Sequence, residues 1–227
     1  MNNTMGVRVR LSGGLGNQLW QLSAGLVAAM GAVCPDLSGC SPHAAWIARN
    51  CLCLPEAQPA RSLPYGHYQH LRYAAAPAEV LRLVRPAAAE VLPCVVHLRG
   101  GDYLHHAAYA ATVPTAEVLR ARVALLGVPD DEVLVVTDDP ELAARLCPQW
   151  LCRSGSLLRD FHTLCRAERL VMSSSTLSWW AAYCGQARRV VFPRLWPMDY
   201  GAGADDATCA RRGVELVFDP ERCIIHD

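Results

Sequence analysis

The stretch CVVHLRGGDY, residues 94–103, joins a short apolar run to a glycine turn that carries charged side chains. Cys94–Leu98 predicts a buried strand, because short apolar segments bounded by turn residues are typical of the interior of a parallel sheet. His97 and Arg99 are two residues apart, so both side chains are expected on one face of the sheet. The turn then places polar groups at the carboxyl edge of the strand, where ligands bind in such sheets.

Strand and helix patterns alternate on both sides of this stretch. Strands are expected at 7–11, 132–137, 170–173 and 190–192, and helices at 15–31, 77–84, 115–126, 140–146, 157–168 and 176–183. This alternation predicts a parallel, doubly wound α/β sheet. Residues 33–76 contain five prolines and little periodicity, and are expected to be mainly loop with short elements. An Ala-rich link between Pro86 and Pro93 predicts two halves, 1–88 and 89–227.

The composition is that of a folded protein without excess charge. The 227 residues are 52% hydrophobic, and 21 basic side chains balance 21 acidic ones. Nucleic-acid binding and attachment to anionic membranes depend on excess positive charge, so neither partner is indicated. The chain has no run of 18 apolar residues, and its start contains no apolar stretch of signal-peptide length. These features predict a cytoplasmic protein without a membrane span.

Eleven cysteines are distributed over expected core segments and loops. In a cytoplasmic chain, reduced thiols that act as small apolar side chains are the preferred interpretation. The tightest cluster comprises Cys34, Cys40, Cys51 and Cys53, and zinc binding is the alternative interpretation of this cluster. Its spacing lacks the paired C-x2-C knuckles of structural zinc sites, so no metal site is predicted.

Arg99 is the first candidate ligand-binding side chain. An arginine at the carboxyl end of a buried strand can hold a phosphate through two parallel hydrogen bonds, and it keeps its charge. The alternative is a structural ion pair with Asp102 that shapes the turn. His97, taken alone, is more typical of a hydrogen-bonded core histidine.

A glycine-rich segment, SGGLGNQ at residues 12–18, lies between the first expected strand and helix. Gly14 and Gly16 let the backbone approach a ligand closely, and N–H groups at a helix start attract anions. Asn17 and Gln18 place amides at the same sheet edge. The pattern is neither G-x-G-x-x-G nor a P-loop, and a tight turn without a ligand is the alternative.

Two further polar segments follow expected strands. Asp138, in TDDPE at 137–141, can accept hydrogen bonds from a purine or a ribose, and an aspartate before a helix is also an ordinary N-cap. Ser174, Ser175 and Thr176 open a helix, where hydroxyl and N–H groups meet the positive end of the helix dipole. The sequence contains no D-x-D triplet, so a metal-clamped diphosphate is not indicated.

In order along the chain, these segments resemble the α-1,2-fucosyltransferase family, glycosyltransferase family 11. The family pattern has a GGLGNQ loop, an HxRRGDY segment, an S/T-D-D-P segment after a strand, and a segment of ST-F-SWW type. The corresponding stretches here are GGLGNQ at 13–18, HLRGGDY at 97–103, TDDPE at 137–141 and SSTLSWW at 174–180. Asp160 leads a helix where the family also has an Asp-led helix. The four motifs in this order are much more specific than any one of them.

The resemblance implies a GT-B fold of two Rossmann-like halves with parallel sheets, the N-terminal half being short. It implies inverting transfer of L-fucose from GDP-fucose to a sugar acceptor, the 2-OH of a galactoside being the expected target, with no metal required. The main catalytic effect in such a displacement is stabilisation of the leaving diphosphate by fixed donors. Protein O-fucosylation is a related activity that the absence of a secretory signal disfavours.

Carried over to this sequence, the family roles place Arg99 at the β-phosphate and the departing GDP, and His97 and Asp138 at the nucleoside. The segment 174–176 is expected at the pyrophosphate, and Asn17, in the other half, at the fucose and phosphates. The expected donor-binding residues are therefore Gly14, Gly16, Asn17, Gln18, His97, Arg99, Asp138, Ser174, Ser175 and Thr176. The expected catalytic residues are Arg99, Asp102 and Asn17.

The general base and the activity itself have alternatives. Asp102 is the first candidate for the base, and His105 and His106 are alternatives because histidine is a common general base. Gly100 stands where the family has a second arginine, and the segment before residue 97 is shorter than in the family. These departures favour, as the alternative function, a non-catalytic nucleotide-sugar or glycan-binding protein.

Overall fold

The chain divides into two compact units. The computed structural model describes residues 6–29, 33–54, 59–196 and 214–226. Unit 1 is Met1–Pro86 and unit 2 is Ala87–Asp227, so the division lies two residues before the expected boundary after residue 88. Unit 1 has a three-stranded sheet and unit 2 a six-stranded sheet. Both sheets are parallel and accompanied by helices, which is consistent with a Rossmann-like α/β fold.

Unit 1 is a β-α-β unit with an additional helix and strand. Its elements are β1 (Gly6–Arg10), α1 (Leu15–Ala29), β2 (Val33–Asp36), α2 (Pro42–Cys51), β3 (Pro59–Ser62), a 3-10 turn (Leu71–Tyr73) and α3 (Pro77–Leu83). The strand order is β2-β1-β3, and the register pairs Val7 with Val33. Gly25 lets α1 approach this sheet, because a Cβ there would lie 2.6 Å from Val9 Cγ2.

The expectation that residues 33–76 are mainly loop is wrong in part, because they contain β2, α2 and β3. β2 has only four residues and includes Pro35, and proline is depleted in strands. α2 begins at Pro42, whose fixed φ suits the first helical position. Ser41 caps this helix by accepting a hydrogen bond from the Ala44 N–H. The prolines therefore mark the starts of elements as well as loops.

Unit 2 contains a six-stranded parallel sheet. Its strands are β4 (Leu92–Leu98), β5 (Val133–Thr137), β6 (Leu151–Arg153), β7 (Ala167–Val171), β8 (Arg189–Pro193) and β9 (Cys223–His226). Its helices are α4 (Ala107–Ala110), α5 (Ala116–Ala124), α6 (Pro140–Leu146), α7 (Leu157–Cys165) and α8 (Thr176–Cys184), with 3-10 turns at Gly101–His105 and Asp130–Glu132. The strand order is β6-β5-β4-β7-β8-β9. Numbered from one within the unit, this order is 3-2-1-4-5-6, that of Rossmann nucleotide-binding domains.

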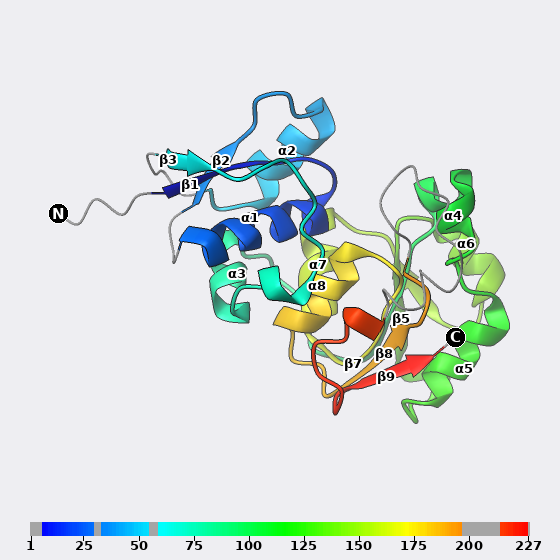
Figure 1. The fold of residues 1–227 in the computed structure, drawn as a ribbon. Coiled ribbons are helices and arrows are strands. Elements are labelled where there is room, and N and C mark those ends of the chain that lie inside the picture. Colours follow the sequence, from blue (N-terminus) through cyan, green and yellow to red (C-terminus); the bar gives the residue numbers. More distant parts are fainter. Residues whose placement is uncertain (1–5, 30–32, 55–58, 197–213, 227) are drawn as a thin grey trace. The chain divides into compact units, whose positions relative to one another are not determined.

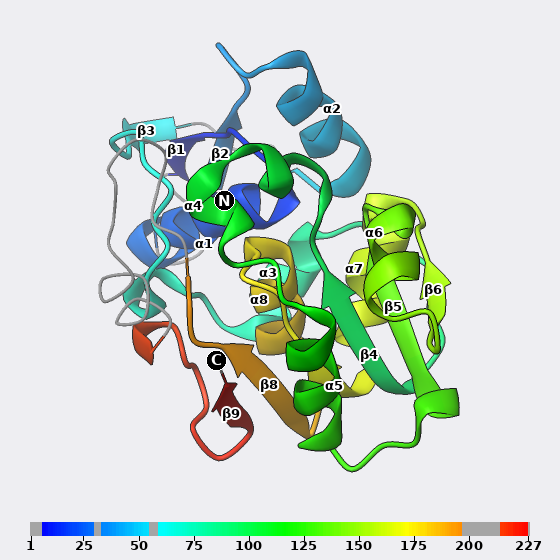
Figure 2. The same ribbon diagram turned by 90° about the vertical axis from the view of Figure 1, so that its right-hand side faces the viewer.

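Different helices cover the two faces of this sheet. Cys94, Val96 and Leu98 of β4 form a buried core with residues of α5 and α6. α7 and α8 pack against each other on the opposite face (Figure 1 and Figure 2). Because side chains alternate along a strand, His97 of β4 points to the α7–α8 side.

The direction in which strands are added reverses between β4 and β7. From β4 the chain adds β5 and β6 on one side, and it then adds β7, β8 and β9 on the other. The segments after β4 and β7 lead away in different directions at the carboxyl edge. Parallel α/β sheets bind ligands beside such a reversal point.

Some boundaries and two edge strands differ from the sequence prediction. α7 ends at Cys165 rather than 168, and β7 spans Ala167–Val171 rather than 170–173, so Ser173 lies beyond the strand. β6 and β9 are not predicted from the sequence. They have three and four residues respectively, and Leu151 of β6 is 70% exposed. Such short edge strands carry too little alternation to be recognised.

Candidate functional site

Polar side chains from three segments meet at the carboxyl edge of the sheet of unit 2. Arg99 follows β4, Asp138 follows β5, and Ser173 lies two residues beyond β7. An ion pair joins the first two segments, and a hydrogen bond between His97 and Ser173 joins β4 to the third. The structure therefore brings together residues that the sequence places in separate motifs.

Two carboxylates bind the guanidinium of Arg99. Its Nη2 lies 2.6 Å from Asp102 Oδ1, and its Nη1 lies 2.5 Å from Asp138 Oδ2. Its Cζ also lies 5.3 Å from the centre of the Tyr103 ring, which is within cation–π range. The ion pair between Arg99 and Asp102, raised as an alternative from the sequence, is thus present alongside a second one. The Arg99 side chain is 32% exposed, so solvent reaches it.

The turn after Arg99 requires glycine. The N–H of Gly100 donates to Asp138 Oδ1 over 2.9 Å. A Cβ at Gly100 would lie 2.6 Å from Asp139 Cβ and 2.8 Å from Leu142 Cδ2. These separations are too short for carbon atoms, so a side chain at position 100 displaces either the turn or the start of α6. An arginine at position 100 would therefore require such a displacement.

The two aspartates of the TDD segment have different roles. Asp139 is the N-cap of α6, and its Oδ1 accepts a hydrogen bond of 2.9 Å from the Leu142 N–H. Asp138 instead binds Arg99 and Gly100. The sequence leaves open which aspartate caps the helix, and the structure assigns the cap to Asp139.

His97 links β4 to the segment after β7. Its Nδ1 lies 2.7 Å from Ser173 Oγ, and the Ser173 carbonyl accepts a hydrogen bond of 3.0 Å from the Ser178 hydroxyl. Burial, and then the nearby charge of Arg99, lower the pKa of His97 from its ordinary value near 6.5 to about 3. The imidazole is therefore neutral near pH 7 and acts as a fixed hydrogen-bonding group.

The serine hydroxyls at the start of α8 are engaged within the protein. Ser174 Oγ donates to the Leu195 carbonyl over 2.6 Å. Ser175 caps α8 by accepting a hydrogen bond from the Leu177 N–H. Both serines are buried, whereas Thr176, the first residue of the helix, is partly exposed. An anion at this helix end would therefore meet backbone N–H groups and the helix dipole rather than these two hydroxyls.

Tyr103 and Ser173 are site residues that the sequence-based prediction misses. The Tyr103 hydroxyl donates to the Ser174 carbonyl over 3.0 Å, while its ring lies against Arg99. Tyr103 therefore connects the two sides of the reversal point. Two sequence signals could have found them. Tyr103 ends the HLRGGDY segment, and Ser173 directly precedes SSTLSWW.

The double tryptophan belongs to the core. Trp179 and Trp180 are fully buried, and their ring centroids lie 4.9 Å apart in an edge-to-face arrangement. The Trp179 Nε1–H donates to the Leu216 carbonyl over 2.9 Å. These contacts fix α8, whose N-terminus lies at the candidate site.

The glycine loop of unit 1 lies at the carboxyl edge of β1. Gly13 has φ +71°, and a Cβ there would lie 2.7 Å from Asn17 Nδ2, so this position favours glycine. Gly14 is exposed, whereas Gly16 is buried in the first turn of α1. Asn17 is partly exposed, and its Oδ1 accepts a hydrogen bond of 3.2 Å from Gln69 Nε2. Gly14 and Asn17 are thus the more accessible of these predicted residues.

Gln18 stabilises the loop from inside unit 1. It is fully buried, and its Nε2 donates to the carbonyls of Gly13 over 3.0 Å and Ala44 over 2.9 Å. These bonds connect the glycine loop to α2. A contact between Gln18 and a bound donor would require the buried amide to leave them.

A polar network that the sequence does not predict lies beside the same loop. The Ser12 N–H donates to Gln21 Oε1, and Gln21 Nε2 donates to Ser12 Oγ, each over 2.9 Å. Ser12 Oγ also lies 3.2 Å from the Tyr65 hydroxyl, and Arg10 Cζ lies 5.1 Å from the Tyr65 ring centre. Tyr65 is 59% exposed, so it presents a fixed aromatic ring at the surface of unit 1.

The clustered cysteines do not form a metal-binding group in the part of the chain that the structure describes. Within that part, no three His, Cys, Asp or Glu side chains come together as metal ligands. Cys34 and Cys51 are buried and Cys53 is exposed, while the Cys40 thiol donates to the Leu11 carbonyl over 2.7 Å. Desolvation raises the pKa of the Cys40 and Cys51 thiols.

No protein-family model and no curated protein matches this chain. Its class is therefore given by the fold, an α/β protein with two parallel-sheet units, of which the second has the Rossmann strand order. No helix within the described ranges is long and apolar enough to cross a bilayer.

Proposed function

We propose that this protein transfers L-fucose from GDP-fucose to a sugar acceptor, with inversion at the anomeric carbon. The observation that supports this most directly is that Arg99 and the start of α8 follow the two strands between which the sheet order reverses. Tyr103 connects them by contacting Arg99 and bonding to Ser174. A guanidinium and a helix N-terminus at one sheet edge suit the phosphates of a nucleotide.

In this proposal the donor diphosphate replaces one carboxylate at Arg99. Asp102 is the exchangeable partner, because its side chain is 57% exposed. Asp138 stays in place, because it also binds the Gly100 N–H, and its contribution to donor binding is to position the guanidinium. His97 contacts the nucleoside side of the donor as a neutral hydrogen-bonding group.

The proposed reaction exchanges one bond at C1 of fucose for another. The acceptor oxygen bonds to C1 while the bond from C1 to the β-phosphate oxygen breaks, and GDP leaves with the electron pair. Arg99 and the N–H groups of α8 stabilise the charge that develops on the leaving phosphate. Asp102, released from Arg99 by the diphosphate, takes the acceptor proton.

The acceptor side of the proposal rests on unit 1. Asn17, partly exposed beside the exposed Gly14, is the proposed ligand-binding side chain of this unit. The proposed acceptor group is the 2-OH of a galactoside. The reaction as proposed requires no metal ion.

Release of GDP from GDP-fucose by the purified protein tests the proposal, with and without a panel of β-galactosides. We expect release that depends on the acceptor, persists in EDTA, and yields a fucosylated product detectable by mass spectrometry. Arg99→Ala should reduce the rate by about 100-fold or more. Arg145→Ala, which removes an exposed arginine of α6, is the matched control and should retain the rate.

Other outcomes separate the competing functions. Binding of GDP-fucose without turnover on any acceptor would favour a non-catalytic nucleotide-sugar-binding protein. An absence of GDP-fucose binding would contradict both the transferase and the binding-protein proposals.

A further inference from the structure

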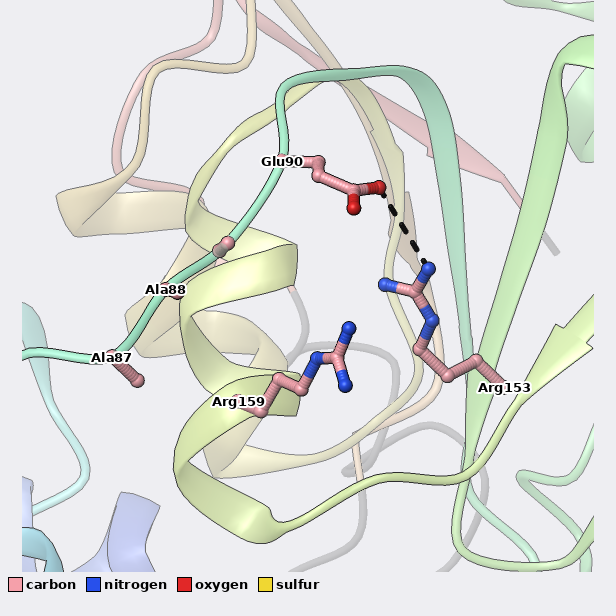
Figure 3. Close-up of a pocket in the computed structure, with 6 residues that line it drawn as sticks. Ala87, Ala88, Glu90, Arg153 and Arg159 are labelled. Carbon is pink, nitrogen blue, oxygen red and sulfur yellow. Dashed lines mark ion pairs between the residues drawn. The ribbon is translucent and has the colours of Figure 1, made fainter.

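A second candidate binding place in unit 2 is a cavity of about 480 Å³ beside α7 (Figure 3). The residues that line it are Ala87, Ala88, Ala89, Glu90, Arg153 and Arg159. None of these residues belongs to the candidate site at the ends of β4, β5 and β7. The cavity and the candidate site therefore share no residues.

Three segments contribute to this cavity. Residues 87–90 lead into β4, Arg153 ends β6, and Arg159 lies in the first turn of α7. The Arg166 Nη1–H donates to the Ala89 carbonyl over 2.6 Å and so holds residues 87–90 along α7. Figure 3 shows both guanidinium groups turned toward the same space, with alanine methyl groups along one side.

The charges in this cavity are incompletely paired. Arg153 Nη2 lies 3.8 Å from Glu90 Oε2, and the Glu90 side chain is 69% exposed. This ion pair is longer than a charged hydrogen bond of about 2.8 Å, and such exposed pairs are weak. The Arg159 guanidinium makes no ion pair or hydrogen bond with another residue of the described ranges. Asp160, the one carboxylate of α7, accepts a hydrogen bond from the Gly155 N–H. The charges of Arg153 and Arg159 act on this carboxylate without forming an ion pair with it.

Two guanidinium groups that share a cavity repel each other, and an anion between them removes this repulsion. Guanidinium groups also bind tetrahedral oxyanions through charge-assisted hydrogen bonds. We propose that Arg153 and Arg159 bind the phosphate or sulfate group of a small molecule in this cavity. Glu90 competes with that group for Arg153, and the remainder of the ligand lies along the alanine side chains. This inference is independent of fucose transfer.

Titration of the full chain with inorganic phosphate, sulfate and chloride at constant ionic strength tests this proposal. Backbone 15N–1H spectra report on residues 87–90, and the Nε–H signals report on the two arginines. We expect saturable shifts at these signals with phosphate or sulfate and not with chloride. The oxyanion that binds more tightly shows whether the site prefers a phosphate or a sulfate group.

Charge variants make the test specific. The double variant Arg153→Gln and Arg159→Gln should weaken phosphate binding about tenfold or more, because two charged hydrogen-bonding groups are lost. Glu90→Gln should strengthen binding about threefold by removing the competitor. Arg120→Gln and Arg145→Gln remove exposed arginines elsewhere in unit 2 and should change nothing.

Arg99→Gln separates this cavity from the donor site, and it should leave the shifts at residues 87–90 unchanged. Shifts that are equal for chloride and phosphate, or that persist in the double variant, would overturn the proposal. Loss of the shifts at residues 87–90 in Arg99→Gln would also overturn the proposal.

Discussion

The carboxylate of Asp138 lies 2.5 Å from the guanidinium of Arg99 and joins the end of β5 to the end of β4. Its second oxygen accepts a hydrogen bond from the Gly100 N–H. One side chain thus fixes both the charged group and the turn beside it. Asp102 contacts the same guanidinium. The described contacts include no hydrogen bond from the turn to the Asp102 carboxylate.

Asp138 and Asp102 are therefore expected to affect GDP binding in opposite directions. Asp138→Asn leaves Arg99 without its fixed partner and should weaken GDP binding about fivefold to tenfold. Asp102→Asn removes the exchangeable competitor and should strengthen GDP binding about threefold, while abolishing transfer. Calorimetric titration with GDP measures both, with Asp131→Asn, an exposed aspartate, as the control. Tighter GDP binding by Asp138→Asn would mean that this residue competes with the phosphate rather than positioning Arg99.

Gly100→Ala should destabilise unit 2. The added Cβ would lie 2.6 Å from Asp139 Cβ, and relief of such an overlap typically costs about 1–3 kcal/mol. Thermal unfolding measures this loss. Gly66→Ala is the matched control, because a Cβ there would make an ordinary contact of 3.6 Å with Tyr68. Equal stabilities of the two variants would show that the turn after β4 adapts to a side chain.

The stability of unit 2 should decrease as the pH falls below about 6.5. The unfolded chain protonates His97 near pH 6.5, whereas burial keeps the folded imidazole neutral down to a pKa of about 3. Well above pH 6.5 this difference in protonation takes nothing from the free energy of unfolding. At pH 5 it lowers the free energy of unfolding by about 2 kcal/mol. Denaturant unfolding at pH 7 and pH 5 measures this difference. His97→Asn should reduce the dependence of the unfolding free energy on pH, whereas His105→Asn, an exposed control, should not. An unchanged pH dependence in His97→Asn would show that His97 is not its source.

Gln18 and Asn17 should separate stability from activity. Gln18→Ala leaves the carbonyls of Gly13 and Ala44 without their donor and should cost about 2 kcal/mol or more of folding free energy. Asn17→Ala removes a partly exposed amide and should change stability by less than about 1 kcal/mol while strongly reducing fucose transfer. Unfolding midpoints and GDP release, measured on the same samples, distinguish the two roles. Loss of stability in Asn17→Ala equal to that in Gln18→Ala would remove the case for a binding role.

The regular part of unit 2 can be predicted from the sequence because its signals are strong. The buried run 133–137 is continuous and apolar, and α6 spans the expected residues 140–146. The short strands β2, β6 and β9 cannot be predicted in this way, because three or four residues carry too little alternation. Their partners along the sheet, distant in sequence, determine that these segments are strands.

The candidate site is predictable in its location and less so in its contacts. Arg99 and Asp138 are placed by the sequence at one sheet edge, since each follows a buried strand. The sequence does not reveal that they bind each other, because side-chain pairing depends on the register of β4 with β5. The burial of the Ser174 and Ser175 hydroxyls is likewise a tertiary property, set in part by the carbonyl of Leu195.

The close approach of Gly100 to Asp139 couples these two positions energetically. In the present geometry a side chain at position 100 overlaps Asp139, the N-cap of α6, so the turn after β4 and the start of α6 must adjust together. Substitutions at the two positions are therefore expected to have non-additive effects on the stability of unit 2.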